Sequence, residues 1–240
     1  MIEAVLFDLD DTLHDDTLAF HSAAERVANE VAAERSIDPR ALYAAYIAEA
    51  EAFWKSLSPD AFGSPLAGLR ARMWATALRS VGIDDVALAE QCGAAYNDYR
   101  RQYLRLWPGA LELLISLRAR GCKLGLITNG MAETHREKIV LLELEGAFDE
   151  IFIADEVGMV KPDPRLFQLA ARRLGVPPER CAMVGDRYER DVRGAHDAGM
   201  FTVWMNVRHE TVPANAPAPG AIVTTIGEVE AALRLAPKEA

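Results

Sequence analysis

The sequence predicts an α/β fold in which a parallel sheet is interrupted, after its first strand, by an all-helical insertion. Residues 4–7 form a short apolar run, as expected of a strand that is buried on both faces. From about residue 14 to 103 the pattern is helical, and from residue 108 onward helix-like and strand-like stretches alternate. Such alternation implies a parallel sheet with right-handed crossovers.

The length of 240 residues fits one α/β domain that carries a smaller inserted unit. We predict that residues 1–15 and 104–240 form the α/β domain and that residues 16–103 form the insertion. Because the insertion follows the first strand directly, it is expected to lie over the strand ends as a lid. Its hinges are expected near residues 13–15 and 104–108.

Four helices are predicted in the insertion, with no strand among them. Asp38-Pro39 is a typical helix start, with Asp38 as the N-cap and Pro39 in the first position. The segments Ser58-Pro59-Asp60 and Gly63-Ser64-Pro65 interrupt the helical pattern. The predicted helices cover residues 18–34, a stretch beginning at 39, 66–80 and 84–103.

After Trp107-Pro108-Gly109 the alternating pattern runs to the end of the chain, and glycines stop several of the helices. The predicted helices are 110–120, 133–144, 164–174, 191–198 and 226–235. The predicted strands are 123–127, 150–154, 181–184, 201–205 and 221–223.

Composition excludes several classes of partner and compartment. The net charge is −10 and no basic run is present, which argues against nucleic-acid and membrane-surface binding. No apolar stretch is long enough to cross a bilayer, and the N-terminus lacks a basic segment followed by a signal-type apolar run. The three cysteines are widely spaced, which argues against a disulfide framework or a zinc site. We therefore expect a cytoplasmic protein; no feature defines its oligomeric state.

Two acids follow the first strand at once. Asp8 and Asp10 lie two residues apart, so in an extended segment they point to the same side. A buried carboxylate is costly unless it is paired or bound to a metal, and paired carboxylate oxygens suit Mg²⁺. The pattern therefore predicts a Mg²⁺ site at this strand end, with a simple acidic turn as the alternative.

Other predicted strand ends also carry polar residues. Thr128 can donate a hydrogen bond to a phosphate oxygen, and the amides of Asn129 and Gly130 open a helix N-terminus, although these residues could equally be only a cap. Lys161 offers a compact positive charge, while as an isolated feature it would be a surface lysine. Asp186 adds a third carboxylate. Asp191 is either a helix cap or a partner of Lys161 or of a metal-bound water.

The order of these residues resembles the haloacid dehalogenase-like (HAD) superfamily. The matching motifs are Asp8-x-Asp10-x-Thr12, then Thr128, then Lys161, then Gly185-Asp186 with Asp191. The resemblance spans residues 6–191 and implies a Rossmann-like parallel sheet, the HAD core, with a helical cap inserted after the first motif. The segments 8–13 and 161–167 are similar to the phosphatase branch.

The resemblance implies a role for each matched residue. Asp8 would attack phosphorus and form an aspartyl-phosphate, and Asp10 would act first as general acid and then as general base. Mg²⁺ would be held by the Asp8 carboxylate, the Asp10 main-chain carbonyl and Asp186. Thr128, Asn129 and Lys161 would bind the phosphoryl oxygens. Thr12 would support the first-motif loop, and Asp191 would support Lys161 or the metal site.

The expected activity is Mg²⁺-dependent hydrolysis of a small phosphomonoester metabolite, a phosphatase reaction. A haloacid dehalogenase is one alternative, but attack on carbon would need neither Asp10 nor a metal. A phosphomutase is another, because it uses the same intermediate. A phospho-receiver domain fits poorly, since here Asp186 follows Lys161 and an insertion follows the acceptor strand. In the insertion, Trp54, Trp74, Arg70 and Arg72 are candidates for either packing or substrate specificity.

Overall fold

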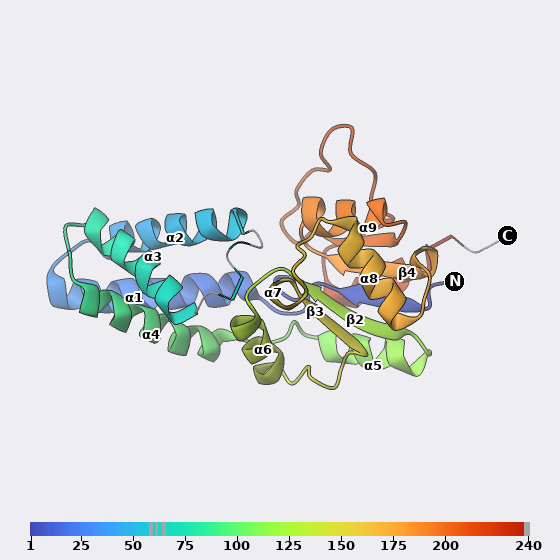
Figure 1. Cartoon of the computed structure of the whole chain (residues 1–240), viewed down its shortest axis with the longest axis horizontal. Helices are drawn as coiled ribbons and strands as arrows, with labels where there is room; N and C mark the ends of the chain where they lie inside the picture. Colours follow the sequence, from blue (N-terminus) through green and yellow to red (C-terminus); the bar gives the residue numbers. More distant parts are fainter. Residues whose placement is uncertain (58–59, 61, 64–65, 238–240) are drawn as a thin grey trace. The chain divides into compact units, whose positions relative to one another are not determined.

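The computed structural model describes residues 1–57, 60, 62–63 and 66–237 (Figure 1). The chain separates into two compact units, one made of Met1–Asp15 with Arg105–Ala240 and the other of Asp16–Leu104. The predicted breaks at Ser58-Pro59 and Ser64-Pro65 lie outside the described residues. That the second unit acts as a lid stays a prediction.

The first unit is built on a six-stranded sheet with the order β3-β2-β1-β4-β5-β6. Every neighbouring pair of strands is parallel, which confirms the predicted α/β class. The first strand lies in the middle of the sheet and is buried along its whole length, as its apolar sequence requires. The strands are β1 (Ala4–Phe7), β2 (Lys123–Thr128), β3 (Glu150–Ile153), β4 (Cys181–Gly185), β5 (Phe201–Met205) and β6 (Ala221–Val223).

Helices cover both faces of this sheet. In Figure 1, α8 and α9 lie on one face and α5 lies on the other. Under α8, the side chains of Leu6, Ile127 and Phe167 belong to one buried apolar cluster. The helices of this unit are α5 (Ala110–Ala119), α6 (Ala132–Leu141), α7 (Ala154–Val157), α8 (Pro164–Leu174), α9 (Arg193–Asp197) and α10 (Val229–Leu233). Short 3₁₀ turns occupy Pro178–Arg180 and Ile226–Glu228.

The structure departs from the predicted boundaries at several helices, among them the last, where a 3₁₀ turn replaces its first residues and α10 ends at Leu233, and the two described next. We expected a helix to residue 144, but α6 ends at Leu141 because Glu143 adopts a left-handed φ of 57° and the Leu144 amide bonds back to the Ile139 carbonyl. We also expected a helix from residue 191, but a π-helical turn, Tyr188–Val192, precedes α9. The short helix α7 was not predicted.

The second unit is all-helical, as the sequence predicts. Its helices are α1 (Asp16–Arg35), α2 (Pro39–Lys55), α3 (Leu66–Ser80) and α4 (Val86–Tyr103). The Asp38 side chain caps α2 by accepting a hydrogen bond from the Arg40 amide. Among the described residues of both units, no helix combines the length and apolar character that crossing a bilayer requires.

Candidate active site

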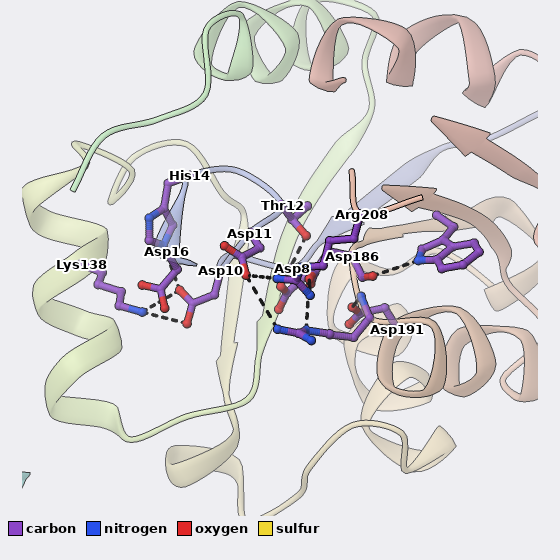
Figure 2. A network of polar contacts seen from close by, with 12 residues as sticks. Asp8, Asp10, Asp11, Thr12, His14, Asp16, Lys138, Asp186, Asp191 and Arg208 are labelled. Carbon is purple, nitrogen blue, oxygen red and sulfur yellow. Dashed lines mark hydrogen bonds and ion pairs between the residues drawn. The ribbon is translucent and has the colours of Figure 1, made fainter. Parts of the chain in front are cut away.

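The candidate site lies at the carboxyl edge of the central strands. Strand pairing places Phe7 of β1 beside Leu126 of β2 and Val184 of β4. The residues that follow these positions, Asp8, Thr128 and Asp186, therefore emerge at the same edge of the sheet. In open α/β sheets this edge is where ligands bind. Figure 2 shows Asp8 and Asp186 close together, each projecting from the end of its strand.

Asp8 is the most enclosed acid of the first motif, with 6 % of its surface exposed. Its Oδ1 accepts a hydrogen bond from Lys161 Nζ at 2.5 Å, and its Oδ2 accepts one from Thr12 Oγ1 at 3.4 Å. Burial raises the pKa of Asp8 to about 7, against the opposing charge of Lys161 and with repulsion from Asp191 and Asp10. A bound cation would favour the anionic form that a nucleophile needs.

Lys161 connects three groups at this edge. Its Nζ also donates to Asp191 Oδ1 at 2.6 Å and to the Ile127 carbonyl at 3.0 Å. Burial alone would lower the pKa of Lys161, but Asp191 and Asp8 reverse the effect, so the pKa is raised and the amine stays charged. Lys161 thus lies between the two carboxylates and keeps a positive charge beside Asp8.

The side chain of Asn129 positions the Lys161 loop. Its Oδ1 accepts a hydrogen bond from the Lys161 amide at 2.8 Å, and its Nδ2 donates to the Lys161 carbonyl at 3.0 Å. We expected Asn129 to offer hydrogen bonds to a phosphoryl group. Because its side chain holds this loop, such a contact would come from its main-chain amide.

Asp191 lies in the π-helical turn rather than at a helix start. Besides Lys161, it accepts a hydrogen bond from the Arg187 amide at 2.9 Å through Oδ2. Gly185 makes room for it, because a Cβ at residue 185 would lie 2.4 Å from the Asp191 carboxyl carbon. Of the two roles left open by the sequence, the structure shows the contact with Lys161.

Asp186 is buried, and its Oδ2 has no hydrogen-bond partner among the described residues. Arg187 Nε and Arg208 Nη1 lie 3.1 and 3.4 Å from this oxygen. Burial, together with repulsion from Asp8 and Asp191, raises the pKa of Asp186 well above its usual value. One oxygen from each of Asp8, Asp186 and Asp191 lies within 4.8 Å of the others. An all-oxygen set of three clustered, largely buried carboxylates fits a hard divalent cation.

Asp10 is held by three basic side chains. Lys138 Nζ lies 2.7 and 2.8 Å from its two oxygens, His14 Nε2 lies 2.9 Å from Oδ1, and His135 Nε2 lies 3.3 Å from Oδ2. Burial would raise the pKa of Asp10, but Lys138 and then His135 outweigh it and hold the pKa well below its usual value. We therefore expect Asp10 to be ionised, and Figure 2 shows its contact with Lys138.

Lys138 and His135 are site residues that the sequence interpretation missed. Both lie on α6, three residues apart and therefore on one helix face. Lys138 is only 2 % exposed, which is unusual for a lysine. The glycine of Thr128-Asn129-Gly130 is required here, since a Cβ at Gly130 would lie 1.8 Å from the His135 ring. The sequence feature that could have identified these two residues is a His and a Lys three positions apart, in a predicted helix that directly follows a strand-end motif.

Arg208 is a further residue that the sequence interpretation missed. It follows β5, the next strand along the sheet, and its Nη2 lies 2.5 Å from Asp11 Oδ2. The polar segment after Met205 is another strand end, so the reasoning that selected Thr128 and Asp186 could have found it.

Comparison with known proteins agrees with this geometry. A model of the haloacid dehalogenase-like hydrolase family matches residues 2–199. The chain is 37 % identical over 207 residues to a glyceraldehyde 3-phosphate phosphatase of Methanopyrus kandleri, covering 85 % of this chain and 83 % of that one. It is 40 % identical over 159 residues to a phosphoserine phosphatase of Thermus thermophilus, covering 65 % and 63 %. It is 30 % identical over 236 residues to mouse N-acylneuraminate-9-phosphatase, covering 97 % and 94 %.

Solved structures show the same fold. The HAD hydrolase YfnB from Bacillus subtilis superimposes with a TM-score of 0.74 at 22 % identity, covering 97 % of this chain and 98 % of that one. A 2-haloacid dehalogenase from Pseudomonas syringae gives a TM-score of 0.66 at 28 % identity, covering 98 % and 99 %. The protein belongs to the haloacid dehalogenase-like hydrolases, which confirms the family resemblance drawn from the motifs.

Proposed function

We propose that this protein is a Mg²⁺-dependent phosphatase that hydrolyses a small phosphomonoester through an aspartyl-phosphate. The observation that carries the proposal is the pair of acids at the end of β1, which lie in opposite environments. Asp8 is beside a charged lysine at the acidic edge, whereas Asp10 is bound by Lys138 and two histidines. Two carboxylates with pKa values pushed apart are typical of a nucleophile and an acid–base pair. A dehalogenase reaction would leave the second acid without a role.

In the first step, an Asp8 carboxylate oxygen bonds to phosphorus as the bond from phosphorus to the alcohol oxygen breaks. Lys161 and the amide of Asn129 stabilise the phosphoryl oxygens. The departing oxygen takes a proton from Asp10. A phosphoryl dianion beside Asp10 raises the pKa of that carboxyl by repulsion, so Asp10 can carry this proton in the complex.

In the second step, water attacks phosphorus and gives a proton to Asp10, and the bond from phosphorus to Asp8 breaks. Inorganic phosphate and the Asp8 carboxylate are the products. Asp186, with the Asp8 carboxylate and the Asp10 carbonyl, would hold Mg²⁺. When bound, Mg²⁺ supplies positive charge that offsets these acids and the phosphoryl oxygens.

The named activities of the relatives support a small phosphorylated metabolite as the substrate. Those enzymes are named for an aldose phosphate, a phosphorylated amino acid and a phosphorylated sugar acid. All three reactions cleave a phosphomonoester, which is the bond that the two-step scheme requires.

Removing the metal should abolish turnover of p-nitrophenyl phosphate, and adding Mg²⁺ should restore it. The reason is that three clustered carboxylates repel one another and the substrate unless a cation offsets them. Calorimetry should detect Mg²⁺ binding to the wild type and a loss of affinity of about tenfold or more in Asp186→Asn. Full turnover by metal-stripped protein would contradict the proposal.

Lys138→Met should lower the turnover of an alkyl phosphate more than that of p-nitrophenyl phosphate. Lys138 contacts both oxygens of Asp10, so its loss frees the side chain that delivers the proton. We expect a loss of about tenfold or more for the alkyl ester, a part of the ~10²–10⁴-fold that general acid catalysis supplies. Lys138→Arg should recover part of it, and Lys123→Met, an exposed lysine, should have no effect. Equal losses for both esters would show that Lys138 is only structural.

A further inference from the structure

The turn that follows β5 is closed by the side chain of its first residue, Asn206. Its Nδ2 donates a hydrogen bond to the Glu210 carbonyl at 2.8 Å, and its Oδ1 accepts one from the Glu210 amide at 2.9 Å. The main-chain amide of Asn206 donates to the Val223 carbonyl of β6 at 2.7 Å. His209, inside the turn, has a left-handed φ of 54°. Residues 206–210 therefore form a closed turn that is fixed to the sheet.

This turn presents Arg208 to two carboxylates at the candidate active site. Arg208 Nη2 lies 2.5 Å from Asp11 Oδ2, and its Nη1 lies 3.4 Å from Asp186 Oδ2 (Figure 2). The two acids come from different loops, one after β1 and the other after β4. Both are buried, whereas about a third of the Arg208 side chain is exposed. One partly solvated guanidinium thus divides its charge between two buried acids.

Asp186 attracts two kinds of positive charge. Arg208 and Arg187 both approach its Oδ2, but the Arg187 contact is made by the next residue along the chain, and half of the Arg187 side chain is exposed. The same carboxylate is one of the proposed ligands of Mg²⁺. A guanidinium and a metal ion that lie close to one carboxylate repel each other, so each weakens the binding of the other.

We propose that Arg208 is a built-in counter-ion that competes with Mg²⁺ for Asp186 and thereby sets the affinity of the site for the metal. This inference rests on the proposed function, in which Mg²⁺ is the cofactor. Asp8, Asp186 and Asp191 lie close enough together to repel one another, and Arg208 offsets part of that repulsion. When Mg²⁺ binds, the guanidinium can give up its 3.4 Å contact with Asp186 and keep its 2.5 Å contact with Asp11. The exchange therefore breaks only the longer of the two contacts.

The first test is calorimetric titration of Mg²⁺ into the wild type and Arg208→Met. Loss of the competing charge should tighten Mg²⁺ binding about threefold or more, which is the effect of one partly exposed ion pair. Arg208→Lys should tighten it less, because the compact amine keeps the charge but cannot contact both acids through a planar fork. The difference between wild type and Arg208→Met should shrink as ionic strength rises, since the Arg208 side chain is partly exposed to screening ions.

Arg180→Met is the matched control for the loss of one positive charge. Arg180 pairs with Glu3 at 2.9 Å, and its side chain is 38 % exposed, close to the 32 % of Arg208. It precedes β4 and Glu3 precedes β1, so this pair lies at the amino edge of the sheet, opposite the candidate site. The control should leave the Mg²⁺ affinity unchanged.

Asn206→Ala tests whether the closed turn positions Arg208. Without the two Asn206 side-chain hydrogen bonds, Arg208 should spend less time beside Asp186, so Mg²⁺ should bind more tightly, though by a smaller factor than in Arg208→Met. Adding Asn206→Ala to Arg208→Met should cause no further increase. A merely structural role for Asn206 would give the same change in both backgrounds.

Urea unfolding in the presence of EDTA tests the counter-ion without any metal. Arg208→Met should lower the urea midpoint more in the wild-type background than in Asp186→Asn, where the charge that Arg208 offsets is already missing. Mg²⁺ binding to Arg208→Met that is no tighter than to the wild type would overturn the inference, and so would equal losses of midpoint in the two backgrounds. If Arg208→Met does not fold, Arg208→Lys supports both comparisons. A wild type that binds no Mg²⁺ would contradict the proposed function instead, and the urea comparison would then decide whether Arg208 is the counter-ion of Asp186.

Discussion

Asp8→Asn is expected to abolish turnover and to leave no trace of an aspartyl-phosphate. An amide cannot supply the anionic oxygen that attacks phosphorus, and it is a weaker ligand for a cation. Loss of a nucleophile typically costs at least ~10⁴-fold in kcat. The measurement is a single-turnover reaction with radiolabelled substrate, quenched in acid, in which the wild type retains label on the protein and Asp8→Asn does not.

The matched control for this experiment is Asp11→Asn. Asp11 lies on the same loop and is also buried, but its carboxylate is paired with Arg208 rather than with Lys161. The Asp11→Asn protein should still acquire label from the substrate. The Asp8→Asn protein should also remain folded by circular dichroism, because Lys161 keeps its contacts with Asp191 and the Ile127 carbonyl. Undiminished labelling of Asp8→Asn would show that another residue is the nucleophile.

The fold was predictable because each element carries a local signal that agrees with the global arrangement. The strand Phe201–Met205 and the helix Pro164–Leu174 have the predicted bounds, since an apolar run defines the first and Pro164 and Gly175 delimit the second. Where prediction failed, the cause was a local conformation with little sequence signal. The left-handed Glu143 ends α6 early, and the turn that contains Asp191 is π-helical, with the Asp191 carboxylate accepting a hydrogen bond from the Arg187 amide.

Sequence reasoning brought together the candidate-site residues at strand ends but not those on a helix. The carboxyl ends of parallel strands share one edge of the sheet. Asp8 and Asp186 could therefore be assigned to one place without knowing how any helix is rotated about its axis. The position of Lys138 depends on how α6 is rotated about its axis, which the sequence does not specify. The same limit applies to Arg70, for which the sequence left open both packing and specificity. Only the interior of the α1–α4 unit shows that it is a buried charge.

Asp10→Asn is expected to separate proton transfer from nucleophilic attack. Asp8 stays in place, and any metal contact from residue 10 survives because it comes from the main-chain carbonyl. The loss should therefore depend on the leaving group. An alkyl phosphate, whose departing oxygen needs a proton, should lose up to the ~10²–10⁴-fold that general acid catalysis supplies. p-Nitrophenyl phosphate should lose less, since its phenolate leaves without a proton.

Steady-state rates alone would obscure this difference, because hydrolysis of the aspartyl-phosphate also needs Asp10 as a base. Single-turnover formation of the labelled intermediate isolates the first step, and the relevant quantity is the rate relative to wild type for each ester. The contacts of Asp10 give a second check, since Lys138→Met should reproduce the same preference to a smaller degree by loosening the carboxylate. An Asp10→Asn protein that phosphorylates itself equally well from both esters, relative to wild type, would show that Asp10 is not the acid. Lys138, His14 and His135 would then be the nearest groups able to supply the proton, because all three contact the same carboxylate.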